Sequence, residues 1–212
     1  MRIPGPDRVL LVYLAVLVGC GSPTVHQGTR PVEPGRWQFA GSLGVGVYAD
    51  LPQESALPTV LPEVSVRHGL APDLDFGVKL YVPGIDLGVK ARLARGDWPV
   101  AIAPSLGWSR TKESTVTTDA LYFWGHLPLI LGHRLGRDTE LNFGPTASYA
   151  IYWPAAGGRA YGVSPGAFVN LDWRLSEHWR LMPELSVHAA ATGDVPVSGW
   201  YAYVGPALIW DP

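Results

Sequence analysis

The sequence predicts an all-β fold: an antiparallel up-and-down transmembrane β-barrel of about ten strands that follows a signal peptide and a short tether. Three observations support this prediction. Apolar and polar residues alternate with a period of two along most of the chain, as in strands with two different faces. Gly and Pro contribute 25 and 20 of the 212 residues, which disfavours a helical bundle. Only 16% of the residues are charged and nine are Trp. With the alternation, this composition leaves one face of the strands apolar enough to contact lipid.

The beginning of the chain has the features of a lipoprotein signal peptide. Residues 9–18 form an uninterrupted apolar run of ten residues, which has the length of a signal h-region and is too short to span a bilayer. The run ends in LVGC at residues 17–20, which resembles the lipobox of bacterial lipoproteins. The resemblance implies a signal peptide over 1–19, cleavage before Cys20, and covalent attachment of diacylglycerol and a fatty acid such as palmitate to Cys20. An ordinary secretory signal and a chance Cys are the alternatives.

The segment after the cleavage site is predicted to be the lipidated N-terminus followed by a flexible tether, over 20–35. Residues 21–35 (GSPTVHQGTRPVEPG) are polar, contain three prolines and show no periodicity. In bacterial lipoproteins an Asp directly after the Cys favours retention in the inner membrane. Gly21 stands there in this chain, so the resemblance implies delivery to the outer membrane.

The folded domain is predicted over 36–212. The alternation is strictest in residues 74–82 and 85–93, which flank the turn residues Pro83 and Gly84. The same pattern predicts ten strands at about 36–49, 59–68, 74–82, 85–95, 99–110, 119–134, 139–153, 160–174, 179–192 and 199–210.

The connections between these strands alternate in length. Short turns follow the second, fourth, sixth and eighth strands, whereas longer loops follow the first, fifth, seventh and ninth. This alternation is typical of outer-membrane barrels, in which the short turns face the periplasm. An even number of strands then places the N- and C-termini of the barrel together on the periplasmic side.

The two faces of the predicted strands differ in side-chain size. In residues 99–110, one face carries Ala, Ser and Gly, and the other carries Val100, Ile102, Leu106 and Trp108. Small side chains suit a narrow lumen, and large apolar ones suit lipid. Eight of the nine Trp residues share the apolar face near strand ends, as expected for membrane interfaces, whereas Trp124 has the parity of the lumen. A soluble β-sandwich with core Trp residues is the alternative.

The last predicted strand carries a further resemblance. Gly205, Leu208 and Trp210 match the spacing of the terminal strand signal of outer-membrane barrels, although Val204 replaces its usual polar residue. The resemblance implies a location in the outer membrane of the Gram-negative envelope. The expected partners are outer-membrane lipids and the machineries for barrel assembly and lipoprotein sorting. A net charge of −2 offers no basic field for nucleic acid.

Prolines inside the predicted strands conflict with this fold. Each one removes a donor from the strand ladder, so we expect a bulge beside each. These prolines have lipid-facing parity and are Pro62, Pro104, Pro145, Pro165, Pro183 and Pro206.

Charged residues with lumen parity form the candidate site. Charges in a narrow lumen carry a large desolvation cost unless they pair, so mixed signs predict cross-strand pairs inside a plugged barrel. A polar track for small solutes is the alternative. The predicted lumen charge network comprises Glu63, Arg67, Asp75, Lys79, Asp86, Lys90, Arg92, Asp172, Arg174, Arg180 and Glu184.

No catalytic or metal-ligating signature is present in the sequence, so we expect no enzymatic activity and no catalytic, cofactor-binding or metal-binding residues. The prediction is a non-enzymatic outer-membrane lipoprotein with a small plugged barrel and a structural or loop-mediated role. A narrow channel is the first alternative. A lipid-modifying enzyme is the second, because His188 and Ser186 resemble the residue types of lipid A deacylase barrels.

Overall fold

A computed structural model describes residues 24–50, 55–82, 84–112, 119–153, 159–189, 192–193 and 200–212. The predicted signal peptide and Cys20 lie outside these ranges, so lipidation stays a prediction. In the described part of the chain, no helix is long and apolar enough to cross a membrane.

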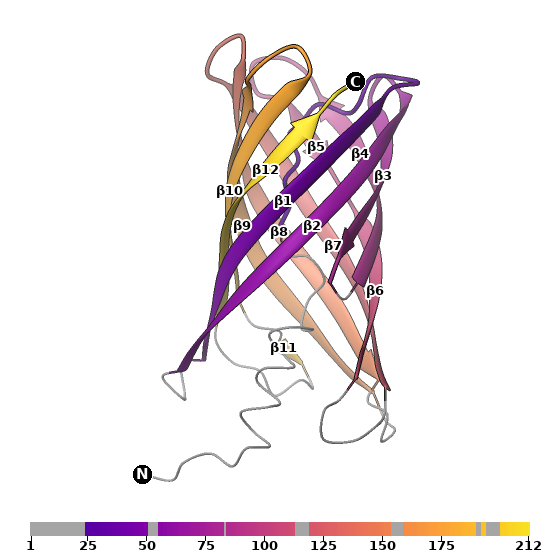
Figure 1. Ribbon diagram of the computed structural model, residues 1–212, viewed down its shortest axis with the longest axis vertical. Coiled ribbons are helices and arrows are strands. Elements are labelled where there is room, and N and C mark those ends of the chain that lie inside the picture. The colour runs from indigo at the N-terminus through magenta and orange to yellow at the C-terminus, as the bar shows by residue number, and fades with distance from the viewer. Residues whose placement is uncertain are drawn as a thin grey trace.

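The described residues form β-strands joined by short turns (Figure 1). The strands are β1 (Trp37–Asp50), β2 (Ser55–Ala71), β3 (Leu74–Tyr81), β4 (Gly84–Ala94), β5 (Val100–Ile102), β6 (Ser105–Lys112), β7 (Asp119–Arg134), β8 (Thr139–Trp153), β9 (Ala160–Arg174), β10 (Trp179–Ala189), β11 (Thr192–Gly193) and β12 (Trp200–Trp210).

The wall is a closed antiparallel barrel of ten strands. β5 and β6 are two halves of one strand, because both pair with β4 on one side and with β7 on the other. β11 pairs only with β9 and extends the wall locally. β12 pairs with both β1 and β10 and so closes the barrel (Figure 1). The predicted fold class and strand number are confirmed.

The strand boundaries follow the alternation closely. β7, β8 and β9 have the predicted limits. β2 is longer than predicted, because residues 55–58, which look like a loop in the sequence, pair with β1. The predicted ninth strand, 179–192, corresponds to β10 and to β11, which both pair with β9, and residues 190–191 between them lie outside the described ranges.

Contrary to the expectation of a bulge beside each proline, no bulge accompanies most of these prolines. β1 and β2 pair in one unbroken register past Pro62, and Pro104, Pro145, Pro183 and Pro206 leave at most a local gap in the ladder. Pro165 is the exception, because the register along β9 shifts by one residue between the pairs Gly166–His188 and Val163–Thr192. At Pro104 the neighbouring backbone keeps its bonds: the Val89 N–H donates to the Pro104 carbonyl at 3.0 Å, and the Ala103 N–H donates to the Pro128 carbonyl at 3.2 Å. Except beside Pro165, the ladder therefore tolerates single missing donors without a change of register.

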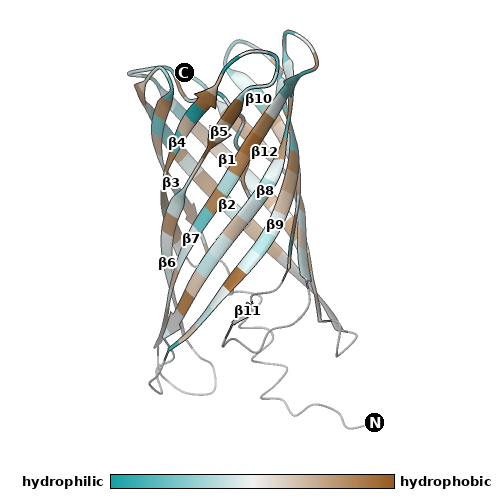
Figure 2. Cartoon of the chain, turned by 180° about the vertical axis from the view of Figure 1, so that it is seen from behind, coloured by the Kyte–Doolittle hydropathy of each residue, from teal (hydrophilic) through white to brown (hydrophobic). Residues whose placement is uncertain are grey.

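Hydrophobic and hydrophilic residues alternate along the strands of the wall (Figure 2), and their burial differs between the two faces. Large apolar side chains such as Val60, Leu106 and Leu127 are exposed on the outer surface. Eight Trp side chains are exposed there as well, whereas Trp124 is only 4% exposed and lies in the lumen. The predicted assignment of the two faces is confirmed.

The two ends of the barrel differ in their connections. The end that we call the turn end carries the short turns after β2, β4, β7 and β9, together with the C-terminus (Figure 1). The opposite end, here the loop end, carries the connections after β1, β3, β6, β8 and β10.

Candidate functional site in the barrel lumen

The lumen is occupied by residues 24–34, which we call the plug segment. Thr24, Val25 and Thr29 are buried with exposures of 3%, 2% and 0%. The segment leaves the lumen at the turn end, where the Gly35 N–H donates to the Gly69 carbonyl at 2.9 Å and the chain enters β1. The prediction of a flexible tether is therefore wrong for these residues. The sequence misses it because the segment is held by polar wall groups and needs no hydrophobic periodicity.

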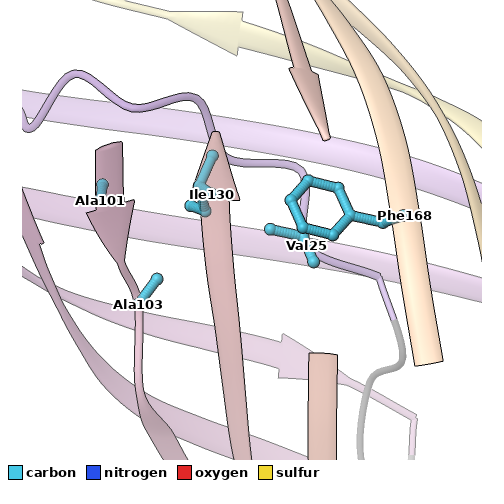
Figure 3. Packing of buried hydrophobic residues seen from close by; sticks show 5 residues of the cluster. All are labelled: Val25, Ala101, Ala103, Ile130 and Phe168. Carbon is cyan, nitrogen blue, oxygen red and sulfur yellow. The ribbon is translucent and has the colours of Figure 1, made fainter. Parts of the chain in front are cut away.

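One apolar contact anchors the inner end of the plug segment. Val25 packs against Phe168 of β9 and Ile130 of β7, with Ala101 and Ala103 beside them (Figure 3). Ile130 and Ala101 are fully buried. This cluster fills the space between the plug segment and the wall.

Glu184 of β10 is the main acceptor for the backbone of the plug segment. Its carboxylate accepts the N–H of Val25 at 2.7 Å and the N–H of His26 at 2.5 Å. It also accepts the side-chain amide of Asn170 at 3.2 Å. These contacts satisfy two buried backbone donors. Without an acceptor, each buried N–H group would reduce the stability of the fold.

Three further wall carboxylates bind the plug segment. Glu63 accepts the Thr24 hydroxyl at 2.6 Å. Glu140 accepts the Thr29 hydroxyl at 2.7 Å and faces the Arg30 guanidinium at 3.3 Å. Asp75 accepts the N–H of Val32 at 2.9 Å. The four carboxylates come from β2, β3, β8 and β10, so the wall binds the segment from several sides.

Basic side chains of the wall compensate part of this negative charge. Asp75 is fully buried and pairs with Arg67 of β2 and, at 3.4 Å, with Lys90 of β4. Lys79 lies 3.9 Å from Glu63 and donates to the carbonyl of Thr24 at 2.8 Å. Asp75 and Lys79 are thus placed in two different pairs, although they lie on one strand face.

The other predicted network residues fall into separate groups. Asp86 accepts the Tyr81 hydroxyl at 3.0 Å and the Trp124 indole N–H at 2.6 Å. Arg180 pairs with Asp172 at 2.7 Å and with Asp211 at 2.9 Å.

Two arginines of the predicted network lie toward the turn end. Arg174 is exposed. Arg92 pairs at 2.7 Å with Asp73, in the turn after β2. Hydrogen bonds from Arg95 and Arg92 lower the pKa of the Asp73 carboxyl below its usual range. These two arginines therefore do not contribute to the deep part of the lumen.

Several buried lumen residues do not belong to the predicted charge network. Glu140, Asn142 and Asn170 are 4%, 0% and 2% exposed. Their lumen parity in the predicted strands was the available signal, since they alternate with the lipid-facing residues of β8 and β9. Thr24 and Thr29 carried no such signal, because the plug segment has no periodicity.

His188 and Ser186 lie deep in the lumen, with exposures of 0% and 1%. His188 stacks on Tyr201 with a centroid distance of 4.8 Å, and its Nδ1 lies 3.4 Å from the Thr146 hydroxyl. The pair therefore does not face the outer surface, where acyl chains would lie. Within the described ranges, no group of three or more His, Cys, Asp or Glu side chains could hold a metal ion.

Little free space remains beside the plug segment. A cavity of about 50 Å³ lies between it and the wall and is lined by side chains that include Glu63, Lys79 and His126. Such a volume holds one or a few water molecules. These contacts and the small cavity indicate that residues 24–34 fill the lumen where they lie against the wall.

Among solved structures, the chain is similar to outer-membrane proteins. An outer-membrane channel from Pseudomonas putida F1 matches with a TM-score of 0.60 and 11% identity, over 89% of this chain and 100% of the other. The attachment invasion locus protein of Yersinia pestis matches with a TM-score of 0.45 and 10% identity, over 84% and 98%. Neisserial surface protein A matches with a TM-score of 0.38 and 8% identity, over 83% and 97%.

No protein-family model and no curated protein sequence matches the chain. The similarity to the Pseudomonas putida channel, with a TM-score of 0.60 at 11% identity, shows that the chain has the fold of outer-membrane β-barrels and shows the fold alone.

Proposed function

We propose that the protein is a non-enzymatic lipoprotein of the bacterial outer membrane, whose small barrel is closed by its own residues 24–34 and has a structural or loop-mediated role. The observation that carries the proposal is the set of contacts between the plug segment and the four wall carboxylates. They give the segment fixed partners along its whole length. The cavity of about 50 Å³ beside the segment supports a lumen that does not conduct.

The proposed orientation places the turn end in the periplasm and the loop end outside. The alternation of turn and loop lengths supports it, as does the position of the C-terminus at the turn end (Figure 1). The exposed Trp side chains near both ends of the strands would then lie at the two membrane interfaces. The connections at the loop end are the surface that external partners would meet.

Planar-bilayer recording tests the closed barrel. We expect the full-length protein to give no steady current, because the plug segment fills the lumen. A variant that lacks residues 24–34 should give a steady single-channel current. A full-length protein with the same current as the deletion variant would show that the segment does not close the barrel. Heat-modifiable mobility on gels checks that both proteins are folded.

Lipidation at Cys20 has its own test. We expect radioactive palmitate to label the wild-type protein in cells and to leave Cys20→Ser unlabelled and uncleaved, because the thiol is the only attachment site. Equal labelling and processing of both proteins would contradict the lipoprotein assignment. The closed barrel would be unaffected by that outcome, since Cys20 lies outside the plug segment.

A further inference from the structure

The lumen has a wall of oxygen acceptors on β8, β9 and β10. Its side chains are nearly all buried and lie next to the plug segment. We define this acceptor wall as Glu140, Asn142, Asn170, Asp172 and Glu184. Three of the five are carboxylates.

The acceptor wall has one basic partner from the barrel itself. Arg180 pairs with Asp172 at 2.7 Å. For Glu140 and Glu184, no Lys or Arg of the described barrel strands lies within ion-pair distance. The plug segment supplies the positive groups in their place: the Arg30 guanidinium lies 3.3 Å from Glu140, and two backbone N–H groups donate to Glu184.

Buried acceptor atoms without hydrogen-bond donors give independent support. The Oε2 of Glu140 accepts no hydrogen bond and, among the described residues, has only the ion pair with Arg30 at 3.3 Å. The Oδ1 of Asn142 also accepts no hydrogen bond, and its residue is 0% exposed. Gln27 of the plug segment has a buried Oε1 in the same situation. Carboxylate and amide oxygens are the ligands that hard cations prefer.

Apart from Arg180, the basic residues that pair inside the lumen lie on another part of the wall. Arg67, Lys79 and Lys90 belong to β2, β3 and β4 and are engaged with Asp75 and Glu63. The charges of the lumen are therefore divided between a paired group on β2–β4 and an acceptor wall on β8–β10. Removal of the plug segment would leave the second group with an excess of negative charge.

We propose that the space occupied by the plug segment is a path for small monovalent cations, with Glu140 and Glu184 as the residues that set its selectivity. The inference rests on the proposed closure by residues 24–34. It concerns the barrel from which the plug segment has been removed or displaced, and it assigns the charge selectivity of that open barrel. A hydrated cation takes the place of the Arg30 guanidinium beside Glu140 and of the backbone N–H groups beside Glu184. Anions meet no unpaired basic group along this wall.

The test uses the variant that lacks residues 24–34 in a bilayer with a KCl gradient. We expect a reversal potential close to the K⁺ equilibrium potential. Replacement of both carboxylates in that variant, Glu140→Gln and Glu184→Gln, should move the potential toward zero. Glu177→Gln is the matched control, because Glu177 is exposed in the turn after β9, and it should leave the potential unchanged.

Each outcome decides the proposal. A potential at zero or on the chloride side overturns the cation path, as does a folded deletion variant that passes no current. An unchanged potential in the double Gln variant overturns the assignment to Glu140 and Glu184. Current through the full-length protein contradicts the closure by the plug segment and leaves the selectivity measurement valid.

If the deletion variant does not fold, a full-length variant provides the test instead. Thr29→Glu places a second carboxylate against Glu140, where the Thr29 hydroxyl now donates at 2.7 Å. Repulsion between the two carboxylates should displace the plug segment and open the same path. The reversal potential of this variant is measured in the same gradient, and a potential on the chloride side or the absence of current overturns the proposal.

Discussion

Asp75→Leu should lower the free energy of unfolding by about 3–5 kcal/mol, the usual cost of leaving a buried charge without its partner. The fully buried carboxylate of Asp75 pairs with Arg67 and Lys90 and accepts the N–H of Val32 from the plug segment. Leucine cannot replace any of these contacts. The loss is measured as a lower midpoint temperature of heat-modifiable mobility or as a lower urea midpoint in lipid vesicles.

A second substitution separates the charge effect from packing. Lys90→Met in the Asp75→Leu background removes one of the two unpaired cations, so part of the stability should return. Lys79→Met in the same background should give no recovery, because Lys79 is paired with Glu63. Equal recovery by both substitutions would contradict the pairing that the structure shows.

Gly69→Val should loosen the plug segment at the turn end and destabilise the barrel by about 1–3 kcal/mol, the usual cost of overpacking. A Cβ atom on Gly69 would lie 2.0 Å from the carbonyl oxygen of Glu33 and 2.6 Å from that of Val32. Both atoms belong to the backbone, so neither can move aside without shifting the plug segment. Protease cleavage within residues 24–34 and the unfolding midpoint are the two measurements.

Gly41→Val is the matched control for this substitution. Gly41 lies in β1, and a Cβ atom there would meet nothing within 4 Å. The control should leave both the midpoint and the cleavage pattern close to those of the wild type. Faster cleavage in the control, or unchanged cleavage in Gly69→Val, would contradict the close packing of the plug segment against β2.

Strand periodicity made most of the wall predictable from the sequence. The limits of β7, β8 and β9 and the outward position of eight Trp side chains follow from alternation alone. The lumen position of Asp75, Asp86 and Lys90 follows from the same parity. The face that a strand residue occupies follows from its position in the alternating pattern, because side chains along a strand point to opposite faces with a period of two.

The contents of the lumen could not be predicted in the same way. The bond from Val25 to Glu184 joins residues 159 positions apart, and that from Thr29 to Glu140 joins residues 111 apart. No local pattern encodes such contacts. The partner of a charge also depends on strand register and side-chain conformation, which is why Asp75 pairs with Arg67 and Lys90 while Lys79 lies beside Glu63.

The position of the plug segment restricts the order of events during biogenesis. The segment directly precedes β1, and β1 pairs with β12, the last strand to be synthesised. Cys20 is four residues before Thr24, at most about 14 Å of extended chain. If Cys20 carries acyl chains, as proposed, then passage of that residue through a finished barrel would bring hydrocarbon past buried charges. Under that proposal, the strands wrap around residues 24–34 before the seam between β1 and β12 closes, so the segment that precedes the first strand is in place before the last strand is paired.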